Sequence, residues 1–274
     1  MLLVVGLPGT QTLPLDRATA ARDELTYVMA KHETAIPHVA WGHYESGGGV
    51  AATVTVPGPG DTNASHGLKN ALDDSVPIVY ISADSKPASL DKHPIHEIEP
   101  DTFENVVKAN FTVDSPYRVL EIVAEAIKRA TTPSRGPVRI GIPYDYLVSS
   151  VPVADVNVTT ERISYDIDRP CEDAAELLES AQRPVVYVGG GARRSTDGQA
   201  AVRRLVERLN APFLVSVKGQ GVVPEDHQNY LGATGKTCQP VPTTLWRPQT
   251  SLSPSERTSM VPTPIIGGSR WGMI

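Results

Sequence analysis

Short apolar runs separated by helix-like segments occupy the first half of the chain. The runs are continuous rather than alternating, which is typical of strands buried on both faces of a parallel sheet. Intervening segments with apolar residues at helical spacing would cover those faces. We therefore predict an α/β domain over residues 1–150, with strands at 1–5, 25–29, 50–56, 76–82 and 138–142 and helices at 61–73 and 117–130.

A second, smaller α/β unit is predicted after a polar, aperiodic stretch. Residues 151–170 lack an apolar period and contain proline, so we expect a linker there. Residues 171–237 then carry a helix, a strand, a glycine loop, a helix and a strand, predicted at 172–181, 184–188, 189–192, 199–209 and 212–215. These elements make about half of a typical domain.

The final segment, residues 238–274, changes character. It is rich in Pro, Thr, Ser and Arg and has no periodic apolar face, which is typical of a disordered tail. A second interpretation is a frameshift, because residues 243–257 back-translate in a neighbouring reading frame into an Ala-rich helix followed by a buried strand. Both interpretations stand at this stage.

Composition and charge exclude several classes of protein. The net charge is −6, with 25 basic and 31 acidic residues, and no local basic cluster offers a face to nucleic acid. Two isolated cysteines, Cys171 and Cys238, suit a reducing cytoplasm and form neither a disulfide framework nor a zinc site. No apolar run approaches the ~20 residues of a membrane span, so we expect no membrane association.

Glycine-rich loops that follow predicted strands are the first candidates for ligand binding. Gly58-Pro59-Gly60 precedes a helix that contains Asn63, and Pro8-Gly9-Thr10 follows the first strand. Glycines let the backbone approach a ligand closely, but the same residues also form ordinary strand-to-helix turns. Gly189-Gly190-Gly191 lacks the spacing of a dinucleotide fingerprint, so a tight turn is expected there.

Glu33 is the candidate for proton chemistry. It lies between a predicted strand and an apolar helix, where a carboxylate can lose solvent and act as a proton acceptor or as a hydrogen-bond partner for a ring nitrogen. The alternative is a glutamate that merely favours the helix dipole. The residue alone leaves both open.

The order of these motifs resembles the thiamine-diphosphate enzymes. Segments 6–10, 31–33, 58–63 and 136–145 are similar to the N-terminal, pyrimidine-binding domain of the group that includes acetolactate synthase, pyruvate oxidase and benzoylformate decarboxylase. Arg183-Pro184-Val185, residues 189–192 and residues 219–227 resemble part of the central domain. The resemblance extends over residues 2–235.

The resemblance implies specific roles. A glutamate at the place of Glu33 hydrogen-bonds the aminopyrimidine ring of thiamine diphosphate and promotes formation of a thiazolium ylid, which attacks a 2-keto acid so that carbon dioxide leaves. The implied cofactor-pocket residues are Gly58, Pro59, Gly60 and Asn63, and the implied substrate-loop residues are Pro8, Gly9 and Thr10.

The resemblance also implies what this chain lacks. The third domain of the family binds diphosphate and Mg²⁺ through a Gly-Asp-Gly motif, and this sequence has none. We therefore expect the pyrimidine half of the cofactor site only, no metal site in this chain, and a homo-oligomer (dimer or tetramer) or a related subunit that supplies the rest. Some relatives bind FAD, but nothing in this sequence supports it. The alternative is a non-catalytic fragment or an interaction module that pairs with a related subunit.

Overall fold

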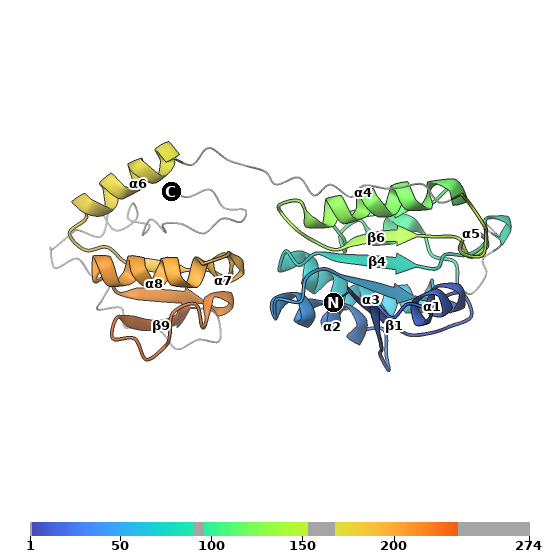
Figure 1. The fold of residues 1–274 in the computed structure, drawn as a ribbon, viewed down its shortest axis with the longest axis horizontal. Helices are drawn as coiled ribbons and strands as arrows, with labels where there is room; N and C mark the ends of the chain where they lie inside the picture. Colours follow the sequence, from blue (N-terminus) through green and yellow to red (C-terminus); the bar gives the residue numbers. More distant parts are fainter. Residues whose placement is uncertain (1, 90–91, 93–95, 153–167, 235–274) are drawn as a thin grey trace, which may run out of the picture. The chain divides into compact units, whose positions relative to one another are not determined.

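The computed structural model describes residues 2–89, 92, 96–152 and 168–234, and the chain divides into two compact units, residues 1–164 and 165–274. Figure 1 shows the elements of both units. The first unit contains β1 (Leu2–Gly6), α1 (Leu13–Ala20), β2 (Leu25–Met29), α2 (Ala35–Glu45), β3 (Ala51–Thr55), α3 (Pro59–Asp73), β4 (Ile78–Ser82), β5 (Ala109–Thr112), α4 (Val119–Thr131), β6 (Val138–Gly141) and α5 (Tyr144–Leu147).

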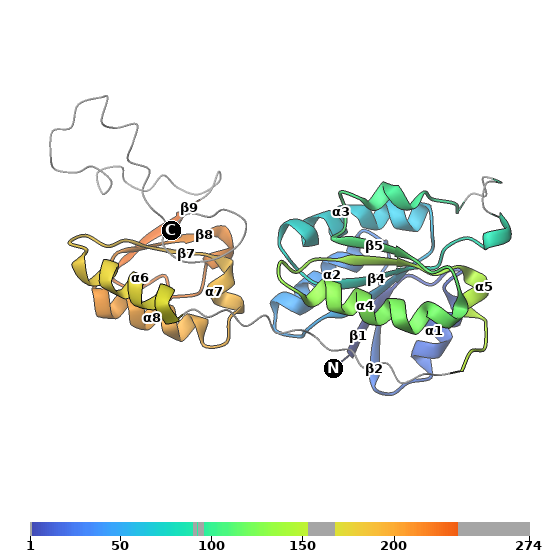
Figure 2. The ribbon, with the colours of Figure 1, turned by 90° about the horizontal axis from the view of Figure 1, so that it is seen from above.

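The first unit is built on one parallel sheet of six strands in the order β2-β1-β3-β4-β6-β5. Helices cover both faces, and α3 and α4 lie on opposite sides of the sheet in Figure 2. Successive residues of β4 point to these two sides: Val79 packs in the cluster that contains Ile122 of α4, whereas Tyr80 packs in the cluster that contains Leu68 of α3. The continuous apolar runs therefore form a sheet buried on both faces, and the α/β prediction is confirmed.

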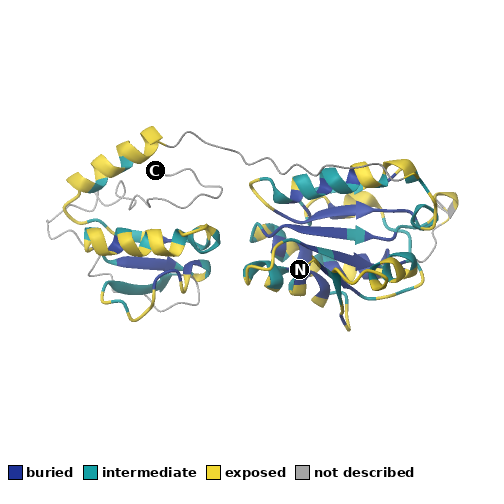
Figure 3. Ribbon diagram, viewed as in Figure 1, coloured by how far each residue is buried: buried dark blue, intermediate teal, exposed yellow. Residues whose placement is uncertain are grey.

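All five predicted strands of the first unit are observed, whereas β5, α1 and α5 were not predicted. Figure 3 shows the central strands largely buried. Strand β5 has the sequence Ala-Asn-Phe-Thr, which carries no apolar run, and its place in the sheet depends on pairing with β6. None of the residues of helix α1 is fully buried, so its sequence has no strong apolar face from which the helix could be predicted.

The second unit has a three-stranded parallel sheet in the order β7-β8-β9. Its helices α6 and α8 show much exposed surface in Figure 3, and no residue of α6 is buried. The elements are α6 (Asp168–Ser180), β7 (Val186–Val188), α7 (Gly190–Arg194), α8 (Gly198–Leu209), β8 (Phe213–Ser216) and β9 (Tyr230–Thr234).

The second unit differs from the sequence expectations in three places. The prediction of a loop at 189–192 is wrong, because residues 190–194 form the short helix α7. At the end of this helix Ser195 N donates a hydrogen bond to Gly191 O at 3.1 Å. Helix α6 begins at Asp168, within the expected linker, and β9 was not predicted. The expected tail, residues 238–274, lies outside the described residues.

Candidate functional site

The strands of the first unit end along a common edge. Gly6, the last residue of β1, is paired with Met29 of β2 and with Val54 of β3. Ser82, the last residue of β4, is likewise paired with Gly141 of β6. The segments that follow these strands therefore meet at the carboxyl edge of the sheet, where open α/β sheets bind their ligands.

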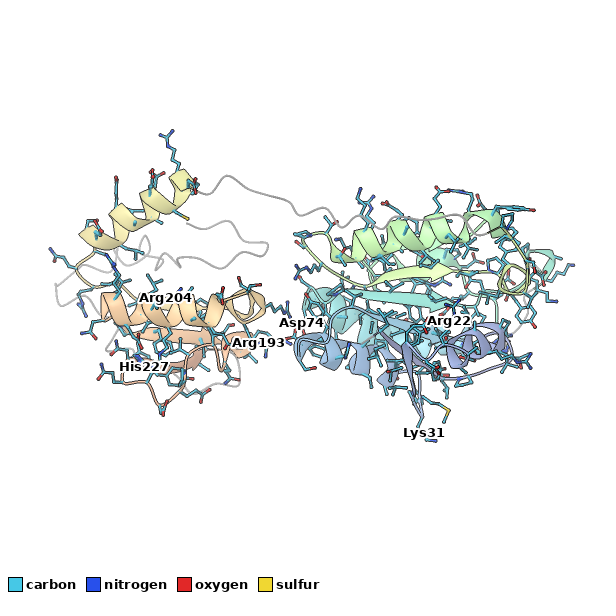
Figure 4. All side chains as sticks on the ribbon, in the orientation of Figure 1. Arg22, Lys31, Asp74, Arg193, Arg204 and His227 are labelled. Carbon is cyan, nitrogen blue, oxygen red and sulfur yellow. The ribbon has the colours of Figure 1, made fainter. Side chains whose placement is uncertain are left out.

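Glu33 and Asn63 meet at this edge although they are distant in sequence. Asn63 Nδ2 donates a hydrogen bond to Glu33 Oε2 at 3.0 Å, and the Thr34 hydroxyl donates to the backbone oxygen of Asn63 at 3.0 Å. Glu33 is partly buried, whereas the nearby Lys31 is exposed and points away from the unit in Figure 4. The second oxygen of Glu33, Oε1, receives no hydrogen bond from any residue that the structure describes.

The loop between β3 and α3 approaches Glu33 closely. Gly58 has a φ of 65° and a ψ of −106°, a conformation that side chains with a Cβ rarely adopt. A Cβ on Gly60 would lie 2.9 Å from Val56 Cγ2 and 3.7 Å from Glu33 Cγ. Pro59 opens helix α3 and is exposed. Glycine at positions 58 and 60 thus lets the loop take its course beside the carboxylate.

The expected substrate loop lies against the same valine. A Cβ on Gly9 would collide with Val56 Cγ1, so the side chain of Val56 contacts both the segment after β1 and Gly60. Pro8 and Thr10 are exposed beside it. The structure therefore brings Pro8, Gly9 and Thr10 to the edge that also carries Glu33 and the Gly58 loop.

A chain of hydrogen bonds holds the segment after β1, the expected substrate loop, in place. Gly9 N donates to the buried Thr12 hydroxyl at 2.9 Å, and this hydroxyl lies 2.7 Å from Asp16 Oδ2. The Tyr27 hydroxyl donates to Asp16 Oδ1 at 2.9 Å. Burial and the neighbouring Asp16 carboxylate raise the pKa of Tyr27 well above its usual range, so Tyr27 keeps its proton and remains a donor.

Behind the Gly58 loop, Asp61 is fully buried among hydroxyl groups. Thr55 Oγ1 donates to Asp61 Oδ1 at 3.2 Å, and the Tyr80 hydroxyl also donates to Oδ1. Ser82 Oγ lies 2.8 Å from Asp61 Oδ2 and 2.8 Å from Asp84 Oδ1, so its single hydrogen is shared between the two carboxylates. Burial and the Asp61 charge raise the pKa of Tyr80 well above its usual value. Charge-assisted hydrogen bonds of this kind compensate an ionised carboxylate for the loss of water.

Arg139 of β6 connects Asp61 to a second carboxylate. Its Nη2 lies 3.4 Å from Asp61 Oδ2 and 2.6 Å from Asp84 Oδ1, and its guanidinium is stacked 4.6 Å from the centre of the Phe103 ring. The Arg139 side chain is fully buried. Burial raises the pKa of Asp84, and the positive charge of Arg139 opposes that effect. Sequence reasoning did not single out this network.

Two cavities open where Asp84 follows β4. They share Asp84, Ser85 and His96, and the larger one has a volume of about 350 Å³ and the smaller one about 190 Å³. The remaining lining residues are Thr10, Gln11, Lys86 and Tyr144 in the larger cavity and Glu97, Ile98, Glu99, Pro100, Thr112 and Pro143 in the smaller one. Thr10 of the expected substrate loop and Asp84 of the buried network therefore border the same space.

The described residues contain no cluster of three or more His, Cys, Asp or Glu side chains able to hold a metal ion. None of the described helices is long and apolar enough to span a membrane. The carboxyl edge of the sheet places the partly buried carboxylate of Glu33 beside the Gly58 loop. This arrangement suits an organic ligand whose nitrogen atoms donate hydrogen bonds.

Two family models match the chain. The model for the thiamine pyrophosphate enzyme N-terminal TPP binding domain matches residues 3–104, and the model for the thiamine pyrophosphate enzyme central domain matches residues 171–245. The chain belongs to the thiamine pyrophosphate enzyme family. The Glu33 and Gly58 segments lie inside the first match, and β7, β8 and β9 lie inside the second.

Relatives in this family include acetolactate synthases. The chain is 30% identical over 241 residues to the acetolactate synthase large subunit of Lactococcus lactis and 32% identical over 249 residues to the acetolactate synthase of Arthrospira platensis. It is 32% identical over 239 residues to a Pseudomonas aeruginosa protein described as a probable 2-ketoarginine decarboxylase. These matches cover 84–85% of this chain, which spans about two fifths of the length of each relative, 41–42%.

A solved structure supports the fold. A Mycobacterium smegmatis protein described as a thiamin diphosphate-dependent enzyme superposes with a TM-score of 0.71 at 23% identity, covering 85% of this chain and 45% of that protein. At this identity the likeness establishes the fold, which agrees with the parallel sheets described above.

Proposed function

We propose that this chain supplies the pyrimidine half of a thiamine diphosphate site, with Glu33 as the hydrogen-bond partner of the aminopyrimidine ring. The observation that carries the proposal is the hydrogen-bonded pair of Glu33 and Asn63 at the carboxyl edge. Beside this pair lies a loop in which Gly58 has a positive φ that favours glycine. The family match over residues 3–104 supports it.

The residues fit an aminopyrimidine. Glu33 is partly buried, and Asn63 engages only one of its two oxygens, so the other can accept or donate a hydrogen bond. Asn63 restrains the carboxylate, which lowers the entropy lost when a ligand binds. Gly60 leaves space beside Glu33 Cγ that a side chain would narrow.

The proposed reaction depends on thiamine diphosphate as the bound cofactor. Thiamine diphosphate supplies an electron sink for decarboxylation of a 2-keto acid and for its joining to an acceptor. In this proposal Glu33 would hold a proton on its carboxyl group or release it to the pyrimidine ring. Pro8, Gly9 and Thr10 border the space that the keto acid would enter.

The other half of the site belongs to a partner in this proposal. The diphosphate and Mg²⁺ would be held by a second copy of a longer chain or by a related subunit, because the described residues hold no metal cluster. Several relatives are named as large subunits, which indicates multi-subunit assemblies among them. A dimer or tetramer in the cytoplasm would match this arrangement.

Titration with thiamine diphosphate, with and without Mg²⁺, tests the proposal by calorimetry. We expect binding to weaken about tenfold or more in Glu33→Gln, because the glutamine cannot exchange a proton with the ring. Glu24→Gln, at the opposite end of the same strand segment, is the matched control and should bind as the parent chain does. No binding in the parent chain, in either condition, would favour the alternative of a non-catalytic interaction module.

A further inference from the structure

We propose that Asp84 is a substrate-facing residue that selects a keto acid carrying a positively charged side chain. The inference rests on the proposed function for the identity of the ligand as a 2-keto acid. Its structural basis is separate from Glu33, and it consists of the buried network and the two cavities at the end of β4.

The Asp84 carboxylate is held in place with one oxygen unused. Its Oδ1 accepts hydrogen bonds from Ser82 Oγ at 2.8 Å and from Arg139 Nη2 at 2.6 Å. No described residue donates a hydrogen bond to Oδ2. A Cβ at position 141 would collide with this oxygen, so Gly141 leaves the space that Asp84 needs. The side chain is 17% exposed and lines both cavities.

The charges of the network favour a cation at this position. Arg139 brings one positive charge to two carboxylates, Asp61 and Asp84. Asp61 accepts from the hydroxyls of Thr55 and Tyr80, whereas the only hydroxyl within reach of Asp84 among the described residues is that of Ser82, whose single hydrogen is shared with Asp61. Arg139 therefore leaves one negative charge of the two carboxylates uncompensated, and Asp84 is the carboxylate that lines the cavities. An ammonium or guanidinium group of a ligand would neutralise this charge.

The charged residues that line the two cavities favour one orientation of the ligand. The smaller cavity is also lined by Glu97 and Glu99, and none of the described residues that line it is Lys or Arg. The larger cavity is lined by Thr10 and by Lys86, whose Nζ is 3.4 Å from Asp145 at the exposed rim. A ligand with a carboxylate toward Thr10 and Lys86 and a cation toward Asp84 matches both cavities.

The probes are 4-guanidinobutanoate and hexanoate, which share a carboxylate and a similar length and differ in the guanidinium group. Each is titrated into the full chain while backbone amide shifts are followed by NMR. We expect the guanidino acid to bind about tenfold tighter than hexanoate and to shift the amides of Asp84 and Ser85. Asp84→Asn should remove this preference while leaving the weak binding of hexanoate unchanged.

Asp101→Asn is the matched control, because Asp101 is an exposed carboxylate near the smaller cavity that does not line it. It should retain the preference. Equal affinities for the two probes, absence of binding by both, or an undiminished preference in Asp84→Asn would overturn the inference. Neither probe requires thiamine diphosphate, so selective binding of the guanidino acid without cofactor binding would contradict the proposed function and leave the cation site standing.

Discussion

Replacing Arg139 by methionine tests the energetics of the buried network. Methionine keeps much of the length and apolar volume of the side chain, so packing against Phe103 changes less than the charge does. The change leaves Asp61, which is fully buried, and Asp84 without their shared cation. Removing one partner of a buried ion pair typically costs about 3–5 kcal/mol, because the remaining charge stays desolvated.

This loss is large relative to the stability of a domain. Folded domains are stable by about 5–15 kcal/mol, so a loss of about 3–5 kcal/mol in Arg139→Met would remove a fifth or more of that margin. Urea denaturation followed by circular dichroism measures the change as a lower midpoint at an unaltered slope. Asp61→Asn added to Arg139→Met should recover part of the loss, because the double variant buries one charge fewer.

Arg118→Met is the matched control. Arg118 also pairs with two carboxylates, Asp114 and Glu121, but its side chain is 48% exposed. Solvent screens such pairs, so its loss should be close to the error of the measurement. If Arg139→Met lowered the free energy of unfolding by less than about 1 kcal/mol, or no more than Arg118→Met does, the reasoning about buried charge would be refuted.

Two further substitutions test the residues near the carboxyl edge. Gly58→Ala should destabilise the chain by about 1–3 kcal/mol in urea denaturation, because Gly58 has a positive φ. Its control is Gly42→Ala, in the interior of α2 with open space around it, which should stabilise the chain by about 0.5–1 kcal/mol; equal effects would contradict the strain argument. For Asp84 the raised pKa means that the folded chain holds the proton more tightly than the unfolded chain, so its contribution to stability falls as pH rises above its ordinary pKa. Asp84→Asn should therefore gain stability relative to the parent chain as the pH rises above the ordinary pKa of an aspartate, and a difference that stays constant with pH would count against this sign.

The fold was largely predictable because its main strands carry continuous apolar runs. The strand predicted at 25–29 is observed as β2, Leu25–Met29, with the same bounds. Elements without such a run were missed: β5 is held by its pairing with β6, and β9 contains Gly232 at a φ of 121°, beside an irregular register. Their positions depend on tertiary pairing rather than on local pattern.

The candidate site was predictable only in part. Glu33 and Asn63 are 30 positions apart, so their contact follows from the family resemblance and not from local sequence. Asp84 and Arg139 are separated by 55 positions. One signal was available, since Arg139 interrupts an apolar strand and a charged residue inside a buried strand requires a partner. That signal indicates a partner without identifying it.

The central claim is that Glu33 exchanges a proton with the cofactor. Exchange of the thiazolium C2 hydrogen of bound thiamine diphosphate for deuterium, followed by NMR after rapid quenching, measures this directly in the complex with Mg²⁺. The account predicts that Glu33→Gln slows the exchange by about 10²-fold or more and that Glu24→Gln leaves it unchanged. An exchange rate in Glu33→Gln within twofold of the parent rate would contradict it.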